Sequence, residues 1–257
     1  MGEPLVHLDI ADEVARVRLD KPPVNALDLE IIEQLADVVR ELRGSGVRAA
    51  VFSGEGPSLA AGGDIKWMYS KTVARDRASL SRFFPTIQAA FGDIDRLPMP
   101  TIGVVHGMTL GGGFELALAC DLRIAADDAT VGFPEATLGL LPGAGGTQRL
   151  TEIVGHPRAF ELLYTGRTLS AGEAHALGLV NRVAPAASLE DAVEGLLAEV
   201  LRSSRAAAEW IKRCVRANLE DGRGAGMRTE ALGIEALVFD DDAVDRLTAF
   251  VERRARA

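Results

Sequence analysis

The sequence holds few of the residues that form disulfides or bind metals. Only two cysteines, Cys120 and Cys214, occur among its 257 residues, and they form no CxxC pair. Two cysteines so placed give no disulfide framework and fit a reducing compartment, with two buried thiols as the plain interpretation. The four histidines are scattered without the spacing of a zinc site, so we expect no metal.

Long apolar runs and a surplus of positive charge are missing as well. No apolar run has the length of a membrane span, and residues 4–10 alternate like a strand where a secretory signal would begin. The net charge of −9 repels nucleic-acid phosphates and anionic lipids. We therefore expect a cytoplasmic protein that has neither nucleic acid nor membrane as a partner.

What the sequence does contain is an alternation of strand and helix patterns. Patterns of strands recur at 4–10, 13–19, 47–53, 101–106 and 122–126, the first two forming a hairpin. Asp28 is placed to cap an amphipathic helix that ends at Gly44, and residues 114–120 predict another helix. Strands and helices that alternate with short connections predict an α/β fold.

The pattern turns to helices after residue 156. Ser170 and Glu173 predict a capping box for a helix through about 177. Amphipathic stretches predict three long helices at 188–202, 204–219 and 241–255, with a glycine-rich loop at 222–226. We therefore predict two units, 1–200 and an all-helical 201–257.

One segment of the chain is irregular in pattern. Residues 66–80 show no clear period, and we interpret them as a mobile segment. A helix over about 82–96 is expected to follow, with Pro85 near its start and Pro98 just beyond its end.

Three glycines, Gly111 to Gly113, stand between a predicted strand and a predicted helix. The free N–H groups at a helix N-terminus can bind a phosphate or a developing oxyanion. A dinucleotide fingerprint is disfavoured, because the glycines are consecutive and Glu115 would repel a pyrophosphate. A tight packing turn between strand and helix stays open as an alternative.

Two further glycine loops carry weaker signals. Residues 143–149 lack the Lys-Ser/Thr ending of a phosphate-binding loop, and a structural turn before a helix is the better interpretation. Residues 60–66 would let a ligand lie against backbone at Gly62 and Gly63, with Lys66 free to meet a phosphate. A surface loop explains them equally well.

Two acids, Glu115 and Glu135, occur together with the three glycine loops in one order. Glu115 lies on an apolar helix, where a half-buried carboxylate is costly without a partner or a role. Glu135 follows Pro134 in a stretch poor in charge. A helix-dipole contact and an exposed turn acid are the plain alternatives, but together the two could transfer protons beside a bound substrate.

This order of motifs resembles the enoyl-CoA hydratase/isomerase family, also called the crotonase family, over nearly the whole chain. The matching segments are 22–27, 61–66, 106–115, 134–150, 170–183 and 249–254. The resemblance implies a spiral of strand-strand-helix units with a helical C-terminal region that builds homotrimers, often paired into hexamers. It implies an acyl-CoA substrate and no separate cofactor, since coenzyme A is part of that substrate.

The resemblance also assigns roles by position. The N–H groups of Gly63 and Gly112 would hold the thioester oxygen, Glu115 would activate water, and Glu135 would protonate C2 of a trans-2-enoyl-CoA. Burial and a like-charged neighbour would keep one of the two carboxyls protonated. Residues implied in substrate and CoA binding are Val24, Ala26, Ala61, Gly62, Asp64, Ile65, Lys66, Gly111, Pro134 and Gly143.

Both acids together favour a hydratase of fatty-acid or related acyl-CoA breakdown. An isomerase, a dehydratase or an acyl-CoA hydrolase of the same family is the alternative, and a non-catalytic CoA- or RNA-binding member is disfavoured. Gly63, Trp67 and Phe133 depart from the residues common in the family. The ring of Trp67 or of Phe133 would alter the acyl pocket if that ring faced the pocket. Arg253 of a neighbouring subunit is a candidate for the CoA phosphates, with a solvated helix-end charge as the alternative.

Overall fold

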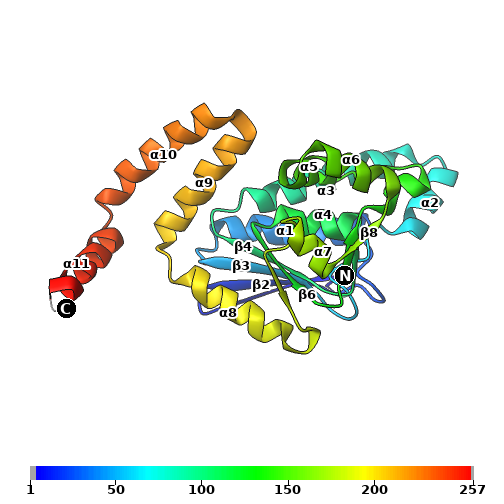
Figure 1. Cartoon of the computed structure of the whole chain (residues 1–257). Helices are drawn as coiled ribbons and strands as arrows, with labels where there is room; N and C mark the ends of the chain where they lie inside the picture. The colour runs from blue at the N-terminus through cyan, green and yellow to red at the C-terminus, as the bar shows by residue number, and fades with distance from the viewer. Residues whose placement is uncertain (1–3, 256–257) are drawn as a thin grey trace.

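Two β-sheets surrounded by helices form the body of the protein, in a computed structural model that describes residues 4–255 (Figure 1). The larger sheet has the strand order β1 (Val6–Ala11), β2 (Val14–Leu19), β3 (Ala49–Gly54), β4 (Thr101–Val105), β6 (Leu122–Ala126) and β9 (Arg182–Ala184). The smaller has the order β5 (Met108–Leu110), β7 (Thr130–Gly132) and β8 (Thr168–Ser170). The predicted hairpin is the antiparallel pair β1–β2, and every other pair in the larger sheet is parallel. The predicted α/β fold is confirmed.

Helices bury both faces of the larger sheet. On one face, Val51, Val104 and Ile124 pack with Val193 and Leu196 of α8 (Leu189–Leu201). The other face belongs to a larger core that includes α1 (Leu29–Gly44), which Asp28 caps as predicted. Because both faces are covered, the central parallel strands are almost continuously apolar.

The course of the chain explains how residues distant in sequence meet. Strand β4 leads through β5 into α4 (Gly112–Ala119), and β6 leads through β7 into the 3₁₀ helix η1 (Pro134–Leu138). Strands β5 and β7 pair in parallel, with Leu110 opposite Gly132, and the Gly111 N–H donates to Gly132 O at 2.9 Å. The start of α4 and the start of η1 therefore lie side by side at the ends of two neighbouring strands.

The expectation of an irregular segment at 66–80 is wrong. Two helices occupy it, α2 (Ile65–Val73) and α3 (Arg77–Asp95), and Asp64 and Asp76 cap their first turns. The predicted helix starts five residues before 82, and Pro85 lies inside it. The sequence pattern was obscured because α2 buries no side chain fully and the buried face of α3 begins only at Phe83.

The glycine-rich loop expected at 222–226 is also wrong. After α9 (Arg205–Asp221), only Gly222 lies between helices, and α10 covers Arg223–Val238. Two glycines of α10 serve close helix packing instead: a β-carbon at Gly226 or Gly233 would lie 2.9 Å from Asn218 or Trp210 of α9, respectively. Small residues allow the two helix backbones to approach closely.

The remaining helices complete the chain. They are α5 (Gly146–Val154), α6 (His156–Thr165), α7 (Ala171–Ala176), the short 3₁₀ helix η2 (Ala186–Ser188) and α11 (Asp241–Ala255). The predicted capping box of Ser170 and Glu173 is present at the start of α7. None of the helices within residues 4–255 is long and apolar enough to cross a membrane.

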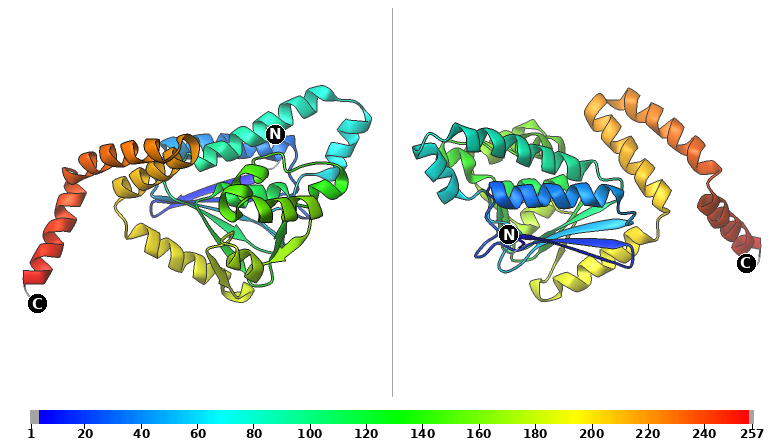
Figure 2. Two further views of the ribbon diagram at one scale, coloured as in Figure 1. Left: turned by 45° about the horizontal axis from the view of Figure 1, so that its top comes forward. Right: turned by 180° about the vertical axis from the view of Figure 1, so that it is seen from behind.

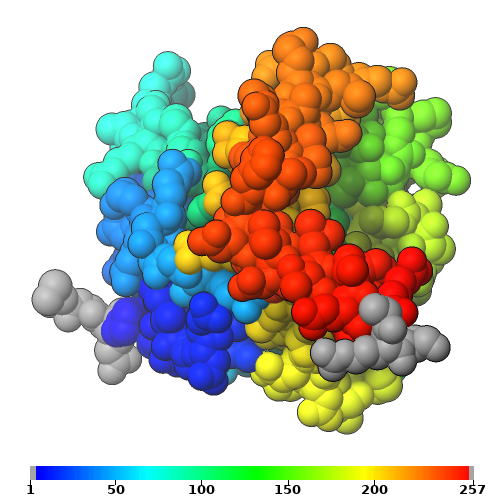
Figure 3. All heavy atoms as spheres, turned by 90° about the vertical axis from the view of Figure 1, so that its left-hand side faces the viewer, coloured from blue at the N-terminus to red at the C-terminus, as the bar shows by residue number. Residues whose placement is uncertain are grey.

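Helix α9 lies against the body, and the helices α10 and α11 extend away from the sheets (Figure 2). Figure 3 looks onto the side where α10 and α11 lie. Large apolar side chains are exposed on these helices and at Phe239, directly after α10: Ile211, Val215, Leu219, Met227, Leu232, Ile234, Val238, Val244, Leu247, Phe250 and Val251. The predicted division into units 1–200 and 201–257 stays a prediction. Residues 1–3 of the first unit and 256–257 of the second lie outside the described residues.

Candidate active site

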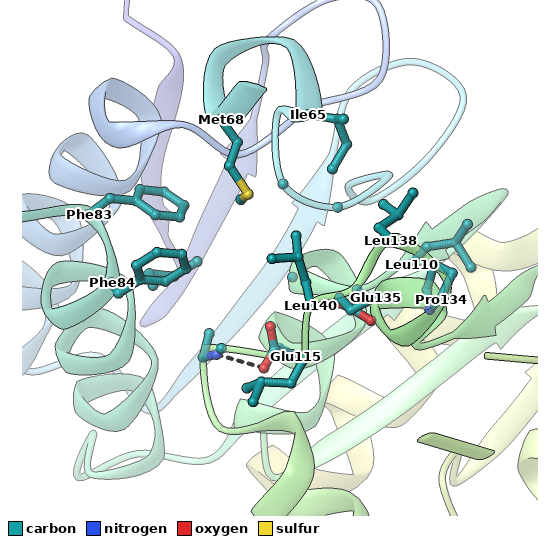
Figure 4. Close-up of a pocket in the computed structure, with 18 of the residues that line it drawn as sticks. Ile65, Met68, Phe83, Phe84, Leu110, Glu115, Pro134, Glu135, Leu138 and Leu140 are labelled. Carbon is teal, nitrogen blue, oxygen red and sulfur yellow. Dashed lines mark hydrogen bonds between the residues drawn. The ribbon is translucent and has the colours of Figure 1, made fainter. Parts of the chain in front are cut away.

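A cavity of about 160 Å³ opens where α2, α3, α4 and η1 meet (Figure 4). Its wall is largely apolar and is formed by Ile65, Met68, Phe83, Phe84, Ile87, Leu110, Leu138, Leu140 and Leu141. Backbone from all three glycine loops reaches it, at Gly62, Gly111 and Gly143 among others. Glu115 and Glu135 are the charged residues that line it. An apolar cavity with a few convergent polar groups is the usual form of a small-molecule site.

Two backbone N–H groups lie close together at one end of the cavity. A β-carbon on Gly112 would stand 3.8 Å from the Gly63 nitrogen, so the two loops are in contact. Within residues 4–255, no backbone or side-chain acceptor is bonded to either N–H. Gly112 is the first residue of α4, where an N–H has no partner inside the helix. The two groups are therefore available to an oxygen of a bound molecule.

The three consecutive glycines, Gly111 to Gly113, serve different structural roles. A β-carbon on Gly113 would stand 1.9 Å from Ala60 O, so this residue provides the tight packing that the sequence left open. Gly111 has φ +48° and faces Glu135. The packing interpretation and the ligand interpretation of the triple glycine thus apply to different members of the run.

Glu115 is buried in the first turn of α4, and its carboxylate is held by backbone. The N–H groups of Ala144 and Gly146 both donate to Oε1, each at 2.7 Å. No donor among the described residues bonds to Oε2, which lies on the side of Gly112, 4.0 Å from the place of a β-carbon there. One oxygen fixes the side chain, and the other is free to bind a proton or a water molecule.

Burial and hydrogen bonding act in opposite directions on the Glu115 carboxyl. Desolvation raises its pKa, while the bonds from Gly146 and Ala144 and the positive charge of Arg149 lower it. The net direction is upward. The two N–H donors oppose this rise, because a carboxylate accepts both bonds more strongly than a carboxylic acid does.

Glu135 has a different environment at the start of η1. It is half-buried, and its Oε2 is buried without a hydrogen-bond partner among the described residues. The pKa of Glu135 is raised to about 7, mainly by desolvation and also by the negative charge of Glu115, while a bond from its own backbone N–H opposes the rise. The causes of this shift are the burial and the like charge expected to keep one carboxyl protonated, and that protonation state stays a prediction.

The segment 22–27 runs directly beside the loop 61–64. Ala61 N donates to Val24 O at 3.0 Å, Leu27 N to Gly62 O at 2.9 Å, and Asp64 N to Leu27 O at 2.8 Å. These bonds fix the Gly63 loop against the turn at 22–25 and the isolated parallel bridge of Leu27 with Gly63. Lys66 is exposed in the first turn of α2, within reach of solvent at the edge of this segment.

The structure gathers most of the residues assigned from sequence. Those that line the cavity are Ala61, Gly62, Gly63, Ile65, Gly111, Gly112, Glu115, Pro134, Glu135 and Gly143. Val24, Ala26, Asp64 and Lys66 lie outside its wall; Asp64 caps α2 and faces Lys21 at 3.7 Å. Their role in binding CoA stays a prediction.

Neither aromatic departure from the family lines the cavity. Trp67 packs behind the wall against Phe83, with ring centroids 5.1 Å apart. Phe133 is buried against Phe114 at 5.2 Å. The rings that face the cavity are Phe83 and Phe84 of α3, which the sequence analysis did not single out.

Comparison with known proteins relates the whole chain to one family. A model described as enoyl-CoA hydratase/isomerase matches residues 9–257. The Bacillus subtilis protein YngF, whose name includes enoyl-CoA hydratase/isomerase, is 35% identical over 257 residues that cover 99% of this chain and 97% of YngF. A crystal structure of enoyl-CoA hydratase from Bacillus anthracis has a TM-score of 0.89 at 32% identity, covering 97% of this chain and 96% of the other. A crystal structure of a Thermobifida fusca YX protein in complex with acetoacetyl-CoA has a TM-score of 0.81 at 33% identity, covering 91% of this chain and 94% of the other.

Proposed function

Because the chain belongs to the enoyl-CoA hydratase/isomerase family and has its crotonase fold, we propose that it is an enoyl-CoA hydratase. The reaction is the addition of water across the 2,3 double bond of a trans-2-enoyl-CoA. One observation carries the proposal: Glu115 and Glu135 line the same cavity as the unbonded N–H groups of Gly63 and Gly112.

The two N–H groups act on the thioester oxygen. Attack of water at C3 moves an electron pair through C2 to this oxygen, which becomes an enolate. Donors that are already oriented stabilise that charge, and loss of one such donor typically costs about 3–4 kcal/mol of transition-state stabilisation. The donors of Gly63 and Gly112 are held by hydrogen bonds to the segment 22–27 and by the start of α4, so they need no reorganisation.

The two acids divide the proton transfers. Glu115, whose N–H donors favour the carboxylate, takes a proton from the attacking water through Oε2. Glu135, whose pKa is raised to about 7, donates a proton to C2 as the enolate collapses. Each acid-base role is worth roughly 10²–10⁴ in rate.

The substrate proposal follows from the family and the cavity wall. A relative is solved with acetoacetyl-CoA, which supports an acyl-CoA here, with the CoA part along 61–66 and its adenine near 22–27. The apolar wall suits an acyl chain. No cofactor besides the CoA of the substrate is needed, and a place in fatty-acid or related acyl-CoA breakdown and a cytoplasmic location stay proposals.

Double-bond isomerisation is the second candidate activity. A single acid with a pKa of about 7 can both remove and return a proton near neutral pH, and Glu135 has that property. The YngF name joins hydratase and isomerase, which supports testing both. A trans-3-enoyl-CoA substrate separates the two, because its conversion requires proton transfer without water addition.

A trimer or a hexamer is proposed for the assembly. The apolar side chains exposed on α9, α10 and α11 support this, since monomeric proteins seldom leave so many large apolar residues uncovered. Light scattering at several protein concentrations tests it, and a monomer at all of them would contradict it.

The absorbance of conjugated enoyl-CoA tests the proposed activity. Purified protein should remove the signal of crotonyl-CoA or of longer homologues in a chain-length series. A series without any loss of signal would show that the protein is not a hydratase.

A further inference from the structure

The loop that orients Glu115 is itself held by an arginine. Arg149, in α5, donates from Nη1 to Ala144 O at 2.8 Å. The N–H of the same residue, Ala144, donates to Glu115 Oε1. The guanidinium also lies against Gly145, where a β-carbon would be 2.2 Å from Nη1. Arg149 thus contacts the short backbone segment that carries both donors to Glu115.

An aspartate fixes the other side of the guanidinium. Asp95, at the end of α3, accepts from Arg149 Nε at 3.1 Å and from Nη2 at 2.5 Å. Both side chains are nearly buried, with 9% of Asp95 and 13% of Arg149 exposed. Both bonds go to Oδ2, and two donors on one buried carboxylate oxygen hold the guanidinium in one orientation.

The same aspartate faces α9, the first C-terminal helix. Arg216 Nη1 lies 3.4 Å from Asp95 Oδ1. One turn earlier, the buried Lys212 bonds to Met99 O and Asp121 Oδ2, which fixes this part of α9 against the body. A chain of three charged side chains therefore runs from α9 to the loop beneath Glu115.

A purely structural role would require only that Arg149 joins α3 to α5. The third contact, to Ala144 O, is not needed for that purpose, and it is the one aimed at the loop. The charged groups around Glu115 are Glu135 on η1 and Arg149 on α5, with Asp95 on α3 and Arg216 on α9 behind the arginine. Arg149 is the group among these whose positive charge favours ionised Glu115.

We propose that Arg149 is a positioning residue for Glu115, and that Asp95 and Arg216 hold it in place and so connect α9 to the catalytic acid. For its catalytic meaning this rests on the proposed hydratase function. Without the guanidinium, the loop at 144–146 loses its fixed position, and Glu115 loses a nearby positive charge. The first effect lowers kcat, and the second shifts the titration of Glu115.

Two substitutions separate these effects. Arg149→Met removes the charge and the donors but keeps much of the stem. Arg149→Lys keeps the charge but cannot bond Asp95 and Ala144 O at once. Arg43→Met is the matched control, because Arg43 also pairs with an aspartate of α3, Asp93 at 2.8 Å, but at the exposed surface.

Carbon-13 NMR of glutamate side chains, with the signal assigned by Glu115→Gln, measures the titration of Glu115 without reference to activity. We expect Glu115 to titrate at a higher pH in Arg149→Met, and near the wild-type pH in Arg149→Lys and Arg43→Met. In hydration assays both Arg149 variants should lose roughly ten- to a hundredfold in kcat with KM little changed, since misplacement of a catalytic group acts on the chemical step.

A wild-type titration and wild-type kcat in folded Arg149→Met would overturn the proposal. If that variant does not fold, Arg149→Lys decides, because an unchanged kcat there excludes positioning by the guanidinium. Wild-type protein without hydratase activity would refute the proposed function alone, and the NMR comparison would still test the link between Arg149 and Glu115.

Discussion

Glu135 lies so close to Gly111 that a β-carbon on the glycine would stand 2.5 Å from Oε1 of the carboxyl group. The contact follows from the parallel pairing of β5 with β7, which sets the first residue after one strand against the first turn after the other. Gly111 therefore leaves the space in which the second acid lies.

Gly111→Ala should displace Glu135 and reduce turnover by about a hundredfold, the loss typical of an ångström-scale shift of a reacting group. The variant should also lose stability, because alanine is strained at φ +48°. Gly56→Ala is the control: Gly56 has φ +75°, but a β-carbon there meets no atom within 4 Å. Equal kcat in the two variants, measured with crotonyl-CoA, would show that the contact with Glu135 does not matter.

The pH dependence of hydration should reflect the protonation of Glu135. As the proton donor it must be protonated, so its raised pKa of about 7 predicts that kcat falls as pH rises through about 7. In Glu135→Gln this fall should be absent from the residual activity. A wild-type kcat that stays constant from pH 6 to about 9 would contradict the assignment of Glu135 as the acid.

The same raised pKa has a cost in stability. Between pH 4.5, the ordinary pKa of a glutamate, and about pH 7, folded Glu135 holds a proton that the unfolded chain has released. Glu135 therefore favours folding at low pH, and this contribution to the free energy of unfolding is lost as the pH rises. Glu135→Gln should therefore match the wild-type Tm near pH 4 and exceed it near pH 8. Glu161→Gln, an exposed glutamate, serves as control. Equal Tm differences at both pH values would show that Glu135 is not destabilised by burial.

Phe84 should limit the length of the acyl chain. Its ring faces the cavity beside Gly143, with a β-carbon there 3.3 Å from Cδ1. Phe84→Ala should shift kcat/KM toward longer enoyl-CoA substrates, by roughly fourfold for each methylene newly buried at about 0.8 kcal/mol. Phe160→Ala removes an exposed ring outside this cavity and should leave the preference unchanged. The same chain-length profile in both variants would exclude Phe84 from the acyl site.

Much of the fold follows from local pattern in the sequence. The hairpin of β1 and β2, the cap at Asp28 and the capping box at Ser170 depend on neighbours within a few residues, and all are present. Helices α2 and α10 were not predicted because their signals are weak. Helix α2 buries no residue fully, and the glycines of α10 contact α9 instead of forming a loop.

The site was predictable only in part. Glu115 and Glu135 are visible as acids in apolar surroundings, but their meeting depends on the register of β5 and β7, which no local pattern encodes. The donors to Glu115 are backbone N–H groups of Ala144 and Gly146. Because nearly every residue type has a backbone N–H, the sequence does not identify which residues act as donors. The glycine loop at 143–149, interpreted as a structural turn, contains both.

Incorporation of labelled water tests the central claim most directly. Wild-type protein with crotonyl-CoA in water labelled with oxygen-18 should form 3-hydroxyacyl-CoA that carries the label, detected by mass spectrometry. Glu115→Gln and Glu135→Gln should each form it roughly 10²–10⁴ times more slowly while binding CoA as the wild type does. Labelled product at wild-type rates from both variants, or no labelled product from the wild-type protein, would contradict a hydratase that works through these two acids.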